Sequence, residues 1–224
     1  MKKKVKMKVK EMNENGFDTD IYLEEQEKAI RERISKFNDK IYIEFGGKLV
    51  NDWHAFRVLK GYRPHTKIEL LKRIKADAGF LFCVSAKDII NGRVRGDYKI
   101  DYRDETIRVL KECKKFGLDI NNVVITLNEE GELHKKIADF YEELKLMGVN
   151  IYIYRTIRNY LNCSINELLR NEYIDVGKRI VVVTGAGGGS GKFGVCLTQL
   201  AHDFSNGKES GYAKFETFSM EFAY

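Results

Sequence analysis

Residues 181–192 read Val-Val-Val-Thr-Gly-Ala-Gly-Gly-Gly-Ser-Gly-Lys, an apolar run followed by five glycines and a lysine. The pattern predicts a buried strand that ends at Thr184 and a helix that begins near Ser190. The loop between them has few side chains to cover its backbone N–H groups, and free N–H groups at a helix N-terminus favour anions. We therefore predict a phosphate-binding loop. Its predicted contact residues are Thr184, Gly185, Gly187, Gly188, Gly189, Ser190, Gly191 and Lys192.

The loop is similar to the Walker A sequence G-x-x-x-x-G-K-[ST], with two departures. Gly191 and Lys192 supply the G-K pair, but Ala186 stands where the first glycine belongs. Phe193 stands where the motif places the hydroxyl that ligates magnesium, and phenylalanine cannot ligate a metal. A nucleotide such as ATP, with or without magnesium, is the candidate cofactor. Phosphate recognition or group transfer is favoured over ordinary ATP hydrolysis.

A second motif, the T-G-x-x-x-G-x-G loop of short-chain dehydrogenases, matches at Thr184, Gly185, Gly189 and Gly191. Those enzymes also need a Tyr-x-x-x-Lys pair downstream, whereas here only Tyr212 and Lys214 follow, at the wrong spacing. A dinucleotide site further needs a residue that binds the ribose about 20 residues beyond the loop, where Lys208 and Glu209 stand. An NAD- or NADP-binding, oxidoreductase-like domain is therefore an alternative prediction, and a glycine-rich turn without a ligand is another.

The charge of the chain is concentrated at its start. The net charge is +6, but residues 1–10 hold six lysines and no acid, and the rest has 33 basic and 33 acidic side chains. We expect residues 1–15 to form a basic disordered arm and residues 16–224 to form one α/β domain. The balanced domain has no basic excess to bind nucleic acid specifically.

Other composition features exclude several classes of protein. No apolar run approaches the roughly 20 residues of a membrane span, and residues 1–10 lack the apolar stretch of a signal peptide. We therefore expect a cytoplasmic protein without a membrane span. The four cysteines and four histidines show no C-x-x-C or H-E-x-x-H spacing, so we expect no metal site. Cys83 and Cys196 stand among apolar residues and are expected in the core.

Apolar runs alternate with helical patterns along the chain. Strands are predicted at 41–45, 80–84, 123–125, 149–154 and 180–183, with a sixth within 211–218. Helices are predicted from Asp18-Thr19 to about Phe37, from Thr66, from Asp104, over 133–147 and over 190–204. This alternation predicts a mostly parallel sheet with helices on both faces, a three-layer fold of the Rossmann-like or P-loop-like kind.

In such sheets the loops at the carboxyl ends of the strands form the site. Glu44 and His54 follow the first predicted strand, Lys87 and Asp88 follow the second, and Thr126 follows the third. We take Glu44, His54, Lys87 and Asp88 as weak candidates for an acid–base set. Each also has a structural interpretation: a half-exposed strand residue, a packed histidine and a helix-start pair. The charges at 93–97 fit a surface salt-bridge network of little energetic weight.

Several of these strand-end segments resemble a bacterial family. They are 44–49 (EFGGKL), 84–89 (VSAKDI), 95–97 (RGD), 122–126 (NVVIT), 189–192 (GSGK) and 211–218 (GYAKFETF). Together they resemble the "domain of unknown function 1846" family, also called uncharacterised protein family 0371. Family members continue well beyond the last segment, so the resemblance implies that this chain is the N-terminal part of a longer architecture. The family loop usually alternates glycine with proline, and this chain has a more flexible version.

Three functional hypotheses follow from these observations. The first is a domain that binds a phosphate-containing small molecule, a nucleotide or a phosphometabolite, with phosphoryl-transfer or nucleotide-dependent chemistry as its candidate activity. The second is the dinucleotide-binding domain described above. The third is a truncated, non-enzymatic fragment whose loop is structural. An exposed sixth strand would also promote self-association, so a homo-oligomer is a candidate state.

Overall fold

The protein, described by a computed structural model over residues 16–46, 48–160 and 162–215, is built on one sheet of six parallel strands. The strands are β1 (Ile41–Phe45), β2 (Ala78–Ser85), β3 (Asn122–Asn128), β4 (Asn150–Arg155), β5 (Ile180–Gly185) and β6 (Gly211–Phe215). Each corresponds to a strand predicted from the sequence. The predicted arm, residues 1–15, and the 216–218 part of the last predicted strand lie outside the described residues.

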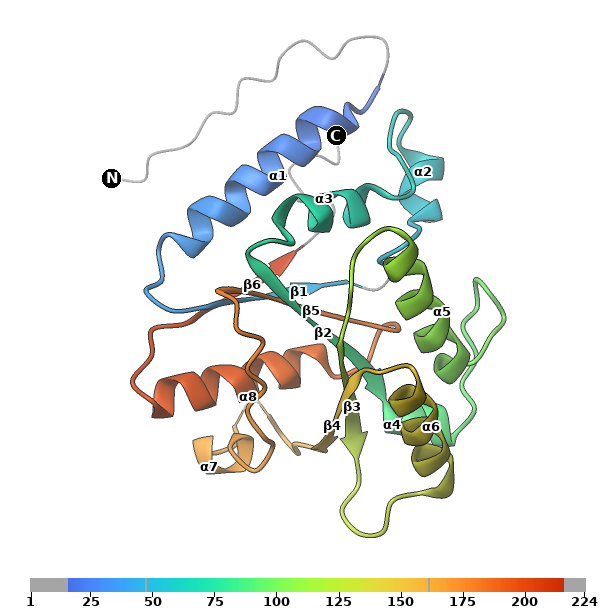
Figure 1. The fold of residues 1–224 in the computed structure, drawn as a ribbon, viewed down its shortest axis with the longest axis vertical. Helices are drawn as coiled ribbons and strands as arrows, with labels where there is room; N and C mark the ends of the chain where they lie inside the picture. The colour runs from blue at the N-terminus through green and yellow to red at the C-terminus, as the bar shows by residue number, and fades with distance from the viewer. Residues whose placement is uncertain (1–15, 47, 161, 216–224) are drawn as a thin grey trace.

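Helices cover both faces of this sheet, which confirms the three-layer α/β fold (Figure 1). One face carries α1 (Thr19–Ile34), α3 (Thr66–Ile74), α5 (Tyr102–Lys115) and α6 (Lys135–Leu146), whose apolar side chains join one core. On the other face lies α8 (Lys192–Ser205), where Val195 and Cys196 join a second, smaller core. In the described ranges, no helix has the length and apolar character needed to cross a membrane.

Three shorter helices complete the described elements: α2 (Trp53–Val58), α4 (Ala86–Ile90) and α7 (Ile165–Leu168). In α4 the side chain of Ser85 accepts a hydrogen bond from the backbone N–H of Asp88, so Lys87 and Asp88 stand in a first helical turn, as their structural interpretation predicted. The predictions did not include α2 and α7, because six and four residues are too few for a helical period to show.

Several predicted helix ends need correction. Asp18 caps α1 as predicted, but the helix ends at Ile34 rather than near Phe37. Thr66 is the first residue of α3 rather than its cap, and its hydroxyl donates to the carbonyl of Arg63. Two further helices begin away from their predicted starts: α5 is capped by Asp101 and begins before Asp104, and α6 begins at Lys135 rather than at residue 133.

The strand order places β5 in the interior of the sheet, between two other strands whose carboxyl ends lie beside its own. It runs β4-β3-β2-β5-β1-β6, so the strand that precedes the glycine-rich loop lies between β2 and β1. Side chains of neighbouring residues alternate between the two faces, and Tyr42 of β1 belongs to the core under α8 whereas Ile43 belongs to the other core. Glu44 therefore faces the α8 side, beside the loop.

Candidate functional site

Three glycines of the loop are required by close packing. An added Cβ would lie 2.5 Å from the carbonyl oxygen of Cys83 at Gly185, and 2.7 Å from the ring of Tyr102 at Gly187. At Gly191 it would lie 2.6 Å from the hydroxyl oxygen of Thr126, and this residue also has a φ of +77°. Only glycine adopts this left-handed conformation without strain. The loop is therefore pressed against β2, α5 and β3, and its path is fixed by its neighbours.

Side chains hold the loop by its carbonyl groups. The Thr126 hydroxyl donates to the carbonyl of Ser190 at 2.8 Å, and Nη1 of Arg95 donates to the carbonyl of Ala186 at 3.0 Å. The Lys192 ammonium donates to the carbonyl of Gly187 at 3.3 Å. Because donors occupy these carbonyl groups, the loop has fewer acceptors of its own to pair with its N–H groups.

Eight consecutive N–H groups, those of residues 187–194, have no acceptor among the described residues. The N–H of Ala186 donates to Cys83, and the next paired N–H is that of Val195, which donates to Gly191 as α8 begins. The first four N–H groups of a helix have no partner within it, and here the preceding loop extends that series. Backbone N–H groups are obligatory donors, so this segment offers a row of donors to water or to a ligand.

Arg95 is a buried anchor of the loop, which corrects the prediction of a weak surface network at 93–97. Its side chain is 8% exposed and forms ion pairs with Asp97, at 2.6 Å, and with Glu105, which is fully buried. The hydrogen bond from Arg95 lowers the pKa of Asp97 and outweighs the opposing effect of its partial burial. The spacing of charges in the sequence could not show this burial, because the covering residues come from α5 and the glycine-rich loop.

Lys192 and Glu44 meet beside the loop. The Lys192 side chain is 8% exposed, and its ammonium lies 3.4 Å from the Ser190 hydroxyl and 3.9 Å from Oε1 of Glu44. The other carboxylate oxygen of Glu44 accepts a hydrogen bond from the Tyr212 hydroxyl at 2.9 Å. Three elements, β1, β6 and α8, thus bring a carboxylate, a phenol and an ammonium together.

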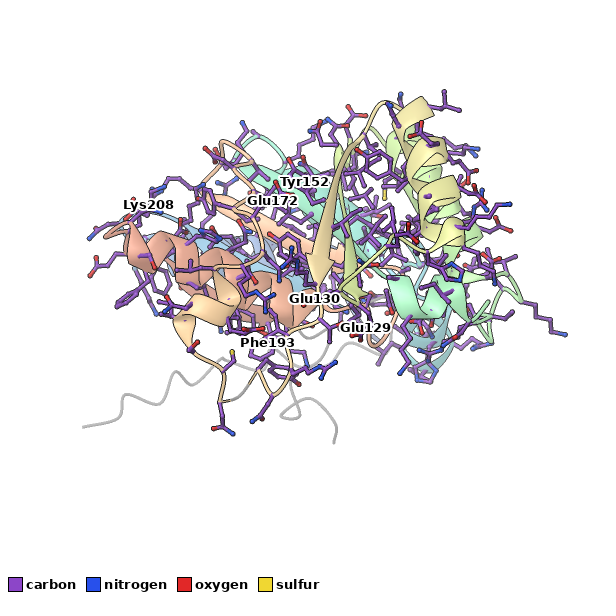
Figure 2. The ribbon with its side chains drawn as sticks, turned by 90° about the horizontal axis from the view of Figure 1, so that it is seen from below. Glu129, Glu130, Tyr152, Glu172, Phe193 and Lys208 are labelled. Carbon is purple, nitrogen blue, oxygen red and sulfur yellow. The ribbon has the colours of Figure 1, made fainter. Side chains whose placement is uncertain are left out.

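A pocket of about 290 Å³ opens beside this cluster on the α8 side of the sheet. It is lined by residues 189–195, by Glu44, by the carboxyl ends of β3 and β4 and by the segment that follows β4. Figure 2 shows Phe193, Glu129 and Glu130 at this end of the molecule, and Lys208 at the far end of α8. A larger hollow of about 480 Å³ is lined by α1 and the Ser35 that follows it, so no second element closes it.

Leu127 shapes the rim of the pocket at the end of β3. It has a φ of +53°, which is unusual for a residue with a branched side chain, and the pairing of β3 with β4 shifts register between Ile125 and Asn128. Irregular strand ends of this kind re-aim side chains next to sites. The sequence did not indicate Leu127, because an apolar run carries no signal for a residue with a left-handed backbone conformation.

The predicted residues fall into two groups. Gly189, Ser190, Gly191 and Lys192 line the pocket together with Glu44, whereas Thr184 is fully buried and its hydroxyl has no hydrogen-bond partner among the described residues. The other acid–base candidates lie apart from the loop. His54 and Lys87 are exposed, Asp88 pairs with Arg93 at 3.2 Å, and no contact in the described ranges joins them to the loop.

The residues expected to bind a ribose lie at the wrong edge of the sheet. Lys208 and Glu209 precede β6, at the amino ends of the strands, and Glu209 accepts a hydrogen bond from Asn38 there. In dinucleotide-binding folds the strand after the glycine loop lies next to the loop strand. Here β1 separates β6 from β5, so the predicted arrangement of Lys208 and Glu209 is absent.

Comparison with known proteins identifies the family. The family model described as "Domain of unknown function DUF1846, N-terminal" matches residues 15–221. The chain belongs to this family. It is 40% identical over 210 residues to a UPF0371 protein of Corynebacterium urealyticum, covering 92% of this chain and 42% of that protein. It is also 42% identical over 210 residues to a UPF0371 protein of Clostridioides difficile, covering 92% of this chain and 41% of the relative.

The family match agrees with the resemblance noted in the sequence and extends over all the described residues. The chain spans about two fifths of the length of the curated relatives it matches. Their names state no ligand or reaction.

Proposed function

We propose that the glycine-rich loop, residues 184–192, binds the phosphate group of a small molecule, either a nucleotide or a phosphorylated metabolite. The observation that carries the proposal is the series of N–H groups at residues 187–194, which lack acceptors among the described residues and continue into the N-terminus of the 14-residue α8. Phosphate oxygens are suitable acceptors for such a series, and the helix dipole adds favourable electrostatics.

Lys192 supports the same proposal. Lys192 lines the pocket, and the ion pair of its ammonium with Glu44 is long, at 3.9 Å. A phosphate oxygen within hydrogen-bond distance would offer this ammonium a shorter, charge-assisted contact. Glu44 would then face the phosphate as a like charge unless a donor on the ligand approaches it. A group of three or more side chains suited to a metal ion is absent from the described residues. Lys192 and Arg155 both line the pocket, so they and the N–H groups offer positive potential to the phosphate.

The test is isothermal titration calorimetry of the purified chain with inorganic phosphate, ADP and ATP, each with and without magnesium. We expect saturable binding that Lys192→Ala weakens by about 10-fold or more, because hydrogen bonds to charged groups contribute roughly 1.5–3 kcal/mol. Lys87→Ala is the matched control, since it removes a lysine that is exposed and apart from the loop. Circular dichroism checks that each variant is folded. Binding that Lys192→Ala leaves unchanged would contradict the proposal.

A second candidate function, dinucleotide binding, is favoured by one observation. Glu44 lies near the carboxyl end of β1, the strand next to β5, and a carboxylate there could accept hydrogen bonds from a ribose. The pocket volume of about 290 Å³ argues against it, because a dinucleotide carries two nucleosides. Fluorescence titration with NADH and NADPH tests this candidate. A folded chain that binds no phosphate compound would favour the third hypothesis, a structural loop. The cytoplasmic location stays a prediction.

A further inference from the structure

The pocket combines its anion-binding end with exposed aromatic side chains. Phe193 follows Lys192 in the first turn of α8 and lies between two tyrosines. Its ring centroid is 5.7 Å from that of Tyr160 and 5.5 Å from that of Tyr212, in edge-to-face geometry. Tyr160 and Phe193 both line the pocket. A side chain that in the Walker A motif would ligate magnesium is therefore replaced by a surface for stacking.

These aromatic side chains are not simply part of the core. Tyr160 is 48% exposed and Tyr212 is 36% exposed, whereas the aromatic rings that fill the interior, such as those of Tyr42 and Phe82, are fully buried. An aromatic side chain exposed beside a pocket can stack on a planar group of a ligand, and such stacking tolerates every base. The position of Phe193, one residue after Lys192, brings the stacking surface within the length of one nucleotide from the loop.

Glu44 adds an acceptor at the same site. Its side chain is 12% exposed, and its Oε2 atom accepts from Tyr212. Its Oε1 atom lies 3.9 Å from Lys192, beyond hydrogen-bond distance, and accepts no hydrogen bond within the described ranges. A carboxylate accepts only, so a ligand that approaches Oε1 has to present a donor. A ribose hydroxyl is such a donor, and it would separate the phosphate from the carboxylate charge.

We propose that the ligand is a nucleoside monophosphate, with its phosphate on the glycine-rich loop, its base against Tyr160 and Phe193, and a ribose hydroxyl donating to Glu44. This inference rests on the proposed function and narrows its ligand class. The volume supports it: about 290 Å³ is at the lower limit of small-molecule sites, which run from roughly 300 to 1,000 Å³. One mononucleotide suits that size better than a dinucleotide.

The first experiment compares ligands that differ by the base. Calorimetric titrations use AMP, GMP, CMP and UMP against ribose 5-phosphate and inorganic phosphate. We expect at least one nucleotide to bind more tightly than ribose 5-phosphate by between about 5-fold and about 150-fold, the range measured for stacking of one base. Tyr160→Ala should reduce this difference and leave ribose 5-phosphate unaffected, while Tyr160→Phe should retain it. Tyr141→Ala, on α6 of the opposite face, is the control.

The second experiment isolates Glu44. We expect the unmodified chain to prefer AMP over 2′,3′-dideoxy-AMP, and Glu44→Ala to abolish that preference. Because the readout is a ratio of two affinities, a general effect of the substitution on phosphate binding cancels. Equal affinity for ribose 5-phosphate and for all four nucleotides, lost in each case with Lys192→Ala, would overturn this inference and leave the proposed function standing. A folded chain that binds none of these compounds would overturn both.

Discussion

The packing of Gly187 against Tyr102 leads to a specific prediction for the loop. A Cβ at residue 187 would lie 2.7 Å from Cε1 and 2.8 Å from the hydroxyl oxygen of Tyr102. Tyr102 is the first residue of α5, is 6% exposed, and has the Arg93 guanidinium 5.3 Å from its ring centroid. The ring has little room to retreat, so Gly187→Ala should push the loop instead. An added Cβ at the adjacent Gly188 has no atom within 4 Å.

The magnitude follows from these distances. Ordinary contact begins at 3.4 Å, so residue 187 and the ring must separate by about 0.7 Å. Overpacking of this kind costs about 1–3 kcal/mol of unfolding free energy. Since binding sites tolerate displacements of only about 0.5 Å, we also expect phosphate affinity to fall by about 10-fold or more. Gly188→Ala should leave stability within about 0.5 kcal/mol or raise it slightly, because alanine restricts the unfolded chain.

The assay is urea unfolding followed by circular dichroism, together with phosphate titration. The double variant Gly187→Ala/Tyr102→Ala removes the obstructing ring. We expect its loss of stability to be smaller than the sum of the two single losses, which a double-mutant cycle measures. The reasoning is refuted if Gly187→Ala and Gly188→Ala have the same stability and the same affinity, or if the cycle shows no coupling.

Four further predictions concern other parts of the molecule. Arg95→Met leaves the buried Glu105 with one of its two arginines and should cost about 3–5 kcal/mol in urea unfolding, whereas Arg95→Lys should cost less. A neutral result for the methionine variant would contradict the anchoring role. Burial raises the pKa of Cys83 and of Cys113 to about 12, so at pH 8 Ellman's reagent should react quickly with the half-buried Cys163 alone. The thiols of the unfolded chain ionise near pH 9. The stability that comes from the raised pKa values of Cys83 and Cys113 should therefore be present below pH 9 and be lost between pH 9 and about 12, as alkaline unfolding curves would show. Within the described residues β6 pairs with β1 alone, so we expect concentration-dependent association in light scattering, and a monodisperse monomer at high concentration would refute it.

Much of the fold could be predicted because buried parallel strands are continuous apolar runs. The run Val181-Val182-Val183 and the apolar runs of the other strands can be recognised in the sequence, and the glycines that follow residue 184 mark the turn. The strand order could not be predicted, because the insertion of β5 between β2 and β1 depends on pairing between distant segments. The predicted start of a helix differs from the observed one where two polar residues could each serve as its N-cap, as Asp101 and Asp104 could at α5.

The candidate site could be predicted only where its residues are contiguous in the sequence or directly follow a predicted strand. The loop and Lys192 are contiguous, and Glu44 follows from its place at a strand end. Tyr102 and Tyr160 reach the loop and the pocket through tertiary contacts that no local pattern reveals. His54 and Lys87 also follow strands, but the short helices α2 and α4 leave their side chains exposed and apart from the loop.

The central place of β5 has a consequence for synthesis on the ribosome. The partners of β1 are β5 and β6, so Ile41 can pair on one side only after residue 180 has been synthesised and on the other only after residue 211. A nascent chain can assemble β2, β3 and β4 early, but it exposes an open edge of β2 and an unpaired β1 until β5 emerges. Sheets that close through such distant contacts fold slowly and are prone to aggregate meanwhile. The glycine-rich loop leaves the ribosome directly behind β5, so binding of the proposed ligand would report that β5 has taken its place between β2 and β1.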